Sequence, residues 1–191
     1  MTADPGRPYR SPMAESTSDA RGPAATTDRS SGPPTLVLRL LSLTTYVGLI
    51  GFVVAEIVQI AQRGTDGLVA ASLTNALVWV VGVNALIIGS GHLVMPDPIA
   101  DSIGWPRGSP FQWEVGLTGL ALGVLGVLSP AFDGDFALAV VIAFSIFYLG
   151  AAVGHVRAMV REHNVSPGNT GFIFWFDVLA PLGVIALYVA S

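Results

Sequence analysis

The amino-acid sequence predicts an all-α membrane protein: a compact bundle of five transmembrane helices, with a short interfacial or re-entrant helix between spans two and three. The first observation is composition, because 52% of the residues are hydrophobic, only 12% are charged and the mean hydropathy is +0.64. A soluble domain carries about 25% charged residues. The second observation is that apolar stretches recur with roughly the 20 residues that a helix needs to cross a bilayer.

Five such stretches follow one another along the chain, separated by proline, glycine and charged residues. Arg63-Gly64 ends the first stretch, Pro96 ends the second and Ser129-Pro130 ends the third. Such residues interrupt an apolar helix or end it. The predicted spans are 36–60, 68–95, 110–128, 135–160 and 171–190.

Residues 1–35 differ in composition from the rest of the chain. Pro, Gly, Ser, Thr, Ala, Asp and Arg dominate this segment without periodicity, so it cannot bury enough apolar area to offset the entropy of ordering. The first apolar run begins only at Leu36, which is not the pattern of a signal peptide. We therefore expect a disordered cytoplasmic tail over 1–35 and a transmembrane helical bundle over 36–191.

The arginines predict the orientation, because cytoplasmic segments of membrane proteins carry an excess of basic residues. With the N-terminus inside, the outer segments hold only Arg63. The inner segments then hold the tail arginines together with Arg39, Arg107, Arg157 and Arg161. The sequence thus predicts a multi-pass protein of the cell membrane, in contact with the lipid bilayer, with its N-terminus in the cytoplasm and its C-terminus outside.

Small residues four positions apart predict where the helices pack, because helices in lipid approach closely only where side chains are small. The pairs with this spacing are Ala85/Gly89, Gly119/Gly123 and Gly150/Gly154. We expect these faces to close the bundle. A homo-oligomer, or docking into a larger membrane complex through a glycine-rich face, is the alternative.

The connection between spans two and three is too apolar for a freely solvated loop. Asp97 followed by Pro98 fits a helix N-cap with proline at the first helical position, and Gly104 fits the C-terminal end. Ser109 and Gln112 have the spacing of a capping box at the start of span three. A short helix at the inner interface, or folded back into the bundle, is expected here.

Four ionisable residues, one from each of spans two to five, are predicted to lie at similar depth near the inner surface. They are His92, Glu114, His155 and Asp177. Tyr148 lies two turns before His155 on the same helix face and is expected to hydrogen-bond within the site. Because ionisable groups in a membrane are costly and usually face the bundle interior, we expect these five side chains to line a ligand pocket. The structural alternative is capping, packing or pairing with nearby arginines.

Pro181 strengthens the argument for polar chemistry at Asp177. Proline has no N–H, so the carbonyl of Asp177, four residues earlier, loses its helical donor. A carboxylate and an unpaired carbonyl at one depth require a partner from a neighbouring side chain, water, an ion or a ligand.

Several classes of protein are excluded by residues that the chain lacks. It has no cysteine, which removes disulfides, thiolate metal sites and cysteine nucleophiles. It contains no phosphate-binding glycine loop, no HExxH zinc motif and no nucleophile elbow. The net charge is -4 without a strongly basic patch, so nucleic acid is not an expected partner.

One long block of residues carries a family resemblance. It reads Gly91-His92-x4-Asp97-x-Ile99-Ala100-x-Ser102-Ile103-Gly104-Trp105-x2-Gly108-Ser109-Pro110-Phe111-Gln112-x-Glu114. This block resembles a family of small prokaryotic membrane proteins of unassigned function, and the segments 150–157 and 167–181 are similar to its later parts. The resemblance covers roughly residues 40–190 and implies a compact helical membrane bundle without an assigned activity. The chain is also similar, through an acid followed by a glycine-rich span, to DoxX-like four-helix membrane proteins.

Three functions compete at this stage. The first is an inner-leaflet pocket for a small ligand or a metal ion, with His92, Glu114, His155 and Asp177 as the metal ligands, since imidazole and carboxylate suit Zn, Mn or Fe. The second is a structural or accessory subunit of a membrane complex. The third is a membrane-embedded enzyme or a proton- or ion-coupled transporter. The cofactor is unknown, and a haem between His92 and His155 has weaker support than a metal ion.

Overall fold

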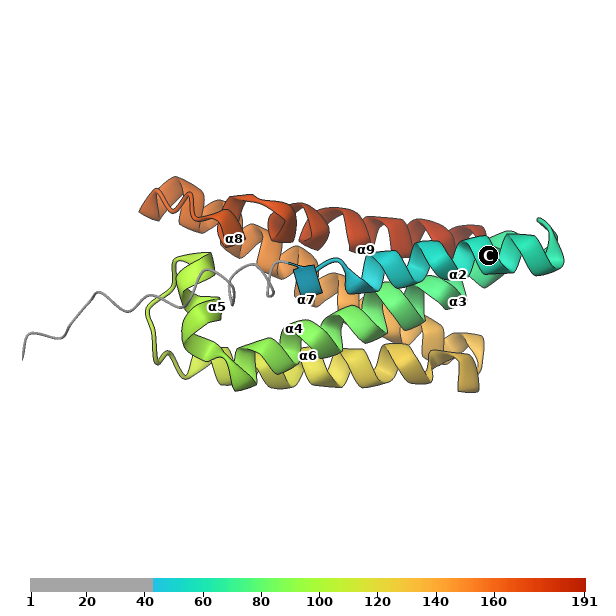
Figure 1. Ribbon diagram of the computed structural model, residues 1–191, viewed down its shortest axis with the longest axis horizontal. Coiled ribbons are helices and arrows are strands. Elements are labelled where there is room, and N and C mark those ends of the chain that lie inside the picture. Colours follow the sequence, from blue (N-terminus) through green and yellow to red (C-terminus); the bar gives the residue numbers. More distant parts are fainter. Residues whose placement is uncertain (1–42) are drawn as a thin grey trace, which may run out of the picture. The chain divides into compact units, whose positions relative to one another are not determined.

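The computed structural model describes residues 43–191, and this part of the chain is helical without strands (Figure 1). Most of its elements are α-helices; η1 is π-helical and η2 is a 3₁₀ turn. In chain order they are α2 (Val47–Arg63), α3 (Leu68–Asn75), η1 (Ala76–Val83), α4 (Asn84–Val94), α5 (Pro96–Ile103), α6 (Phe111–Leu128), η2 (Ser129–Ala131), α7 (Gly134–Glu162), α8 (Pro167–Thr170) and α9 (Phe172–Ala190).

Within residues 43–191, four helical stretches are long and apolar enough to cross a membrane. They are Leu68–Val94, Phe111–Ala131, Gly134–Glu162 and Pro167–Ala190, and they coincide with predicted spans two to five. The first predicted span is described only in part: α2 has 17 residues, and residues 36–42 lie outside the described part of the chain. The predicted tail over 1–35 lies outside it as well, so the five-span count stays a prediction.

A row of glycines brings α4 and η1 into direct backbone contact with α6. A Cβ added to Gly119 would lie 2.8 Å from the Cα of Gly89, and one added to Gly126 would lie 2.6 Å from the backbone nitrogen of Gly82. These distances leave no room for any side chain but hydrogen. The predicted packing through Ala85/Gly89 and Gly119/Gly123 is therefore confirmed, and the glycine face of α6 extends to Gly126.

The third small-residue pair has a different position. Gly150 and Gly154 lie on an exposed face of α7, and a Cβ added to either would meet no atom of residues 43–191 within 4 Å. The expectation that this pair closes the bundle is wrong for the described part of the chain, because the core-facing side of α7 carries larger residues, among them Phe144 and Tyr148.

The predicted short helix between spans two and three is present as α5. It begins at Pro96, one residue before the expected cap at Asp97. Gly104 ends it in the left-handed conformation, φ 82°, and its N–H donates to the carbonyl of Ala100 at 2.8 Å. A glycine is needed there because other residues adopt this conformation at a cost.

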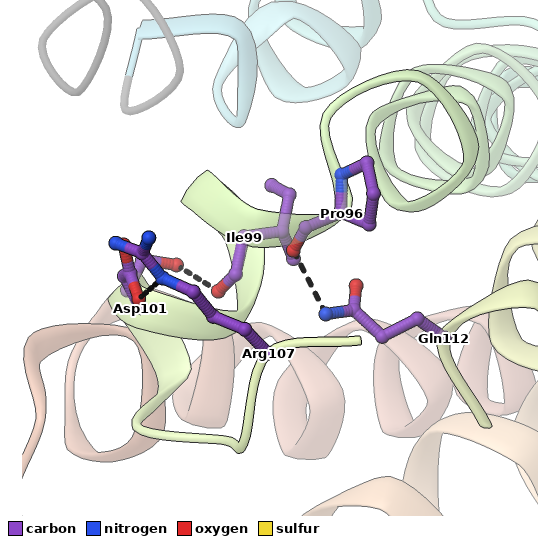
Figure 2. A network of polar contacts seen from close by, with 6 residues as sticks. Pro96, Ile99, Asp101, Arg107 and Gln112 are labelled. Carbon is purple, nitrogen blue, oxygen red and sulfur yellow. Dashed lines mark hydrogen bonds and ion pairs between the residues drawn. The ribbon is translucent and has the colours of Figure 1, made fainter. Parts of the chain in front are cut away.

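The expected capping box at the start of α6 is not formed. Pro110 precedes the helix and no side chain caps its first N–H groups. Gln112 is instead turned inwards, with 2% of its surface exposed, and its amide donates to the backbone oxygen of Pro96 at 2.8 Å (Figure 2). A buried amide must find hydrogen-bond partners inside the protein. Gln112 therefore bonds to Pro96 and does not cap the start of α6.

Aromatic rings fill the core between α7 and α9. Tyr148 packs on Phe144 at a centroid distance of 4.3 Å and meets Phe176 edge-on at 5.7 Å. All three side chains are buried. Asp177, the next residue of α9, is buried as well.

Candidate functional site

The centre of the candidate site is a buried pair formed by His155 of α7 and Asp177 of α9. Asp177 Oδ2 lies 3.3 Å from His155 Nε2, and the two side chains are 9% and 5% exposed. Removing one partner of such a pair would leave an uncompensated polar group in an apolar interior. Both residues were predicted from the sequence, and the structure brings them together.

Asn169 decides which ring nitrogen of His155 carries hydrogen. Its Oδ1 lies 2.6 Å from His155 Nδ1, and its Nδ2 donates to the backbone oxygen of Asn164 at 2.8 Å, which determines the orientation of the amide. Because an amide oxygen only accepts hydrogen bonds, Nδ1 is protonated. The contact between Nε2 and Asp177 therefore shares one proton, which resides on the ring or on the carboxyl group.

The hydrogen bonds continue from Asn169 to α5. The side chain of Asn164 donates to the backbone oxygen of Ile103 at 2.8 Å and accepts from the backbone N–H of Ser166 at 3.0 Å. Asn164 thereby ties the end of α5 to the segment between α7 and α8. The positions of His155 and Asn169 consequently depend on the connection between spans two and three.

Tyr148 contributes to the site through packing. Its ring contacts Phe144, Phe147 and Phe176, and no hydrogen bond from its hydroxyl to His155 or Asp177 is seen in residues 43–191. The predicted hydrogen bond is therefore not observed. Pro181, also buried, lies inside α9 one turn after Asp177, as the sequence indicated.

His92 belongs to a second, separate polar group. Its Nδ1 lies 3.0 Å from Gln112 Oε1, and the Gln112 amide donates onward to Pro96 (Figure 2). Because that second bond determines the orientation of the amide, the oxygen faces His92 and Nδ1 is the donor. The side chain of His92 also lies near the ring of Trp105, at a centroid distance of 6.3 Å. This group joins α4, α5 and α6.

Glu114 does not reach either group. Its side chain is exposed, and its backbone oxygen accepts a hydrogen bond from Thr118. Gln112 occupies the inward-facing position of this turn, and two residues along an α-helix correspond to more than half a rotation. Glu114 was predicted to face the bundle interior. This prediction is wrong, because the side chain lies on the outward face of α6.

The four predicted metal ligands are not gathered into one site. Over residues 43–191, no group of three or more His, Asp or Glu side chains is placed to hold a metal ion. His155 and Asp177 form one pair, His92 bonds to an amide, and Glu114 faces outwards.

An exposed ion pair lies at the surface of the same end of the bundle. Arg107 Nε donates to Asp101 Oδ1 at 2.7 Å, and the guanidinium also bonds the second carboxylate oxygen (Figure 2). The hydrogen bond from Arg107 lowers the pKa of Asp101 below its usual value. Both side chains are well exposed, so the pair contributes little to stability.

Three amides were not predicted from the sequence to take part in the site: Gln112 and Asn169, which bond to His92 and His155, and Asn164, which bonds to Ile103. Two of them are fully buried, and all three bond to backbone or ring atoms. An uncharged amide gives a weak sequence signal, because asparagine and glutamine are common in loops and caps. The sequence signal that could have indicated them is their position beside prolines and glycines that end helices.

Comparison with known proteins assigns the chain to a family but to no activity. A family model described as a family of unknown function (DUF6790) matches residues 41–191. No curated protein and no solved structure matches the chain. The similarity to DoxX-like proteins stays a prediction.

Proposed function

The chain belongs to DUF6790, a family of unknown function, and we propose that it acts through the buried His155–Asp177 pair, which binds and releases a proton inside a multi-pass membrane protein. The observation that carries the proposal is the geometry of the pair: Nδ1 of His155 is occupied by Asn169, so the contact with Asp177 holds a single exchangeable proton. Buried ionisable pairs of this kind serve as proton relays in membrane proteins.

Four apolar helices suggest a multi-pass membrane protein, and we propose that α2 belongs to a fifth span. Three of its apolar side chains, Ile50, Val53 and Ile57, are more than half exposed. A surface of this kind suits lipid better than water. The predicted span over 36–60 includes most of α2 and would be long enough to cross the bilayer.

We propose that the end of the bundle that carries α5 and α8 faces the cytoplasm and that the C-terminus lies outside. Arg107 follows α5, and Arg157 and Arg161 lie in the last turns of α7, near this end (Figure 1). Arg63 lies at the end of α2, on the other side of the span. Basic residues concentrated at one end of the spans support this orientation.

A proton suits the site better than a metal ion or a larger ligand. The pair offers one imidazole nitrogen and one carboxylate, and the remaining ring nitrogen already donates to Asn169, whereas metal sites with protein ligands use three or more. Two surface grooves, of about 420 and 450 Å³, are lined by neither His155 nor Asp177. Tyr148 also packs in this core, and its ring contacts Phe176.

The proposed proton exchange can be followed on the ring nitrogens of the histidines, because the chain has few of them. The chain has three, and His163 is exposed, so histidine-selective ¹⁵N labelling gives two buried rings and one exposed reference. The ring shifts would be recorded on the purified full chain in detergent micelles from about pH 5 to about pH 9. We expect the His155 nitrogens to titrate in wild-type protein and to follow a different course in Asp177→Asn, with His163 unchanged.

The control is Glu114→Gln, which removes an exposed acid from the same end of the bundle and should leave the His155 shifts as they are. Ring shifts of His155 that stay constant over this range in folded protein would reject the proposal. The pair would then be a structural contact between α7 and α9.

A second candidate function, an accessory subunit of a membrane complex, is favoured by the exposed glycine face of α7. Gly150 and Gly154 are open to a partner helix, and Ile146 and Val153 beside them are about 70% exposed. Gly150→Leu should reduce the size of the complex in mild detergent if this face docks a partner. An unchanged mass for wild type and variant would remove this candidate.

A further inference from the structure

The π-helical segment η1 turns two asparagines towards the same neighbour, α2. Asn75 and Asn84 are nine positions apart, which on an α-helix would put them on opposite sides. Each π-helical turn takes in an extra residue, so both lie on the side of α2. Asn75 Nδ2 donates to Glu56 at 2.8 Å, and Asn84 packs against Gly48, where an added Cβ would lie 2.6 Å from the Cβ of Asn84.

Asn84 has no hydrogen-bond partner in this position. The residue is 0% exposed, and within the described part of the chain neither its Nδ2 nor its Oδ1 has a partner. The other two fully buried amides, Gln112 and Asn169, have both ends satisfied. A buried amide without partners is costly, and in a membrane-spanning segment the cost cannot be relieved by bulk water.

The chemistry of the amide specifies what can bind there. A partner must accept from Nδ2 and donate to Oδ1, which a water molecule does and a metal cation does not. The carbonyl of Trp79 also approaches Gly48, at 2.6 Å from an added Cβ, and it already accepts the backbone N–H of Asn84. Its second lone pair and the two amide groups of Asn84 supply about the three partners that a buried water typically has.

We propose that a water molecule binds at Asn84, between α2 and η1, and that it exchanges along the polar side of this interface marked by Asn75 and Glu56. Ser72 and Asn75 both donate to the Glu56 carboxylate, at 2.7 and 2.8 Å. This polar group lies closer than Asn84 to the turn that joins α2 and α3, at the end of the bundle away from α5 and α8 (Figure 1). The site is independent of the proton exchange proposed for His155 and Asp177.

Hydrogen exchange of the asparagine side chains tests the water site directly. The chain has four asparagines, so asparagine-selective ¹⁵N labelling of the full chain in detergent gives four side-chain amides. Asn169 is the matched control, because it is equally buried and bonded only to protein groups. After transfer to ²H₂O we expect Asn84 to exchange about tenfold faster than Asn169 or more.

The exchange route is tested with Asn75→Leu, and Thr74→Val serves as control because Thr74 is exposed and bonds within its own helix. Asn75→Leu should slow exchange at Asn84 by about tenfold, and Thr74→Val should not change it. Exchange of Asn84 as slow as that of Asn169 would overturn the water site. Fast exchange that Asn75→Leu leaves unchanged would overturn the route alone. Neither result depends on the His155 shifts, which report on the proton site separately.

Discussion

Asn169 Oδ1 lies 2.6 Å from His155 Nδ1, and this contact sets the protonation of the whole site. A ring nitrogen that donates to an amide oxygen is unavailable as an acceptor. The opposite nitrogen, Nε2, is therefore the one left to share a proton with Asp177, from which it lies 3.3 Å away. Histidines in functional sites often have one nitrogen oriented by a neighbour so that the other can act.

Replacing Asn169 with leucine should destabilise the protein by about 1–3 kcal/mol, because the ring N–H of His155 and the carbonyl of Asn164 would lose their partners in a buried place. Thermal unfolding in detergent, followed by circular dichroism, measures the loss. Thr170→Val alters the next residue, which bonds only within its own segment, and should have a much smaller effect. Equal effects of the two variants would contradict the importance of the Asn169 contacts.

The His155–Asp177 pair should show strong coupling in a double-mutant cycle. His155→Leu and Asp177→Leu each leave a buried polar group without its partner and should cost about 3–5 kcal/mol. The double variant leaves neither group behind, so its loss should be clearly smaller than the sum of the single losses. Strictly additive losses would mean that the two side chains do not interact.

Glycine-to-alanine substitutions should separate the buried glycine face from the exposed one. Gly119→Ala places a methyl group against the backbone of Gly89 and should destabilise the bundle by about 1–3 kcal/mol. Gly154→Ala meets open space and should leave stability unchanged or raise it by up to about 1 kcal/mol, the gain in helix propensity. Comparison of the two unfolding midpoints checks the prediction, and similar losses in both would contradict the packing of α4 on α6.

The Asp101–Arg107 pair should respond to acid in a defined direction. Since the hydrogen bond from Arg107 lowers the pKa of Asp101, the pair contributes stability above the carboxyl's unfolded-state pKa and loses it as the pH falls through the lowered value. Amide hydrogen exchange in the segment after α5 should therefore be faster in Asp101→Asn than in wild type at neutral pH. The two proteins should become equal in strong acid, and a difference that persists there would argue against this contact.

The helices could be predicted from the sequence, and so could the position of each polar residue along its helix, because both follow from local properties. Length and apolar composition predict a span, and proline and glycine mark its end, so spans two to five and α5 coincide with their predictions. Position along a helix follows from counting residues at a known rise. His155 and Asp177 were predicted to meet on this basis, and they do.

Tertiary structure alone decided which way each side chain faces. Gln112 and Glu114 are two residues apart and both polar, yet one is buried against His92 and the other is exposed. The difference depends on which side of α6 packs against α4, and that choice is made by the glycine contacts along the whole helix. In the same way, the π-helical turns of η1 bring Asn84 to face α2. Position along a helix is a property of its own residues, whereas rotation about its axis is set by the neighbours against which it packs.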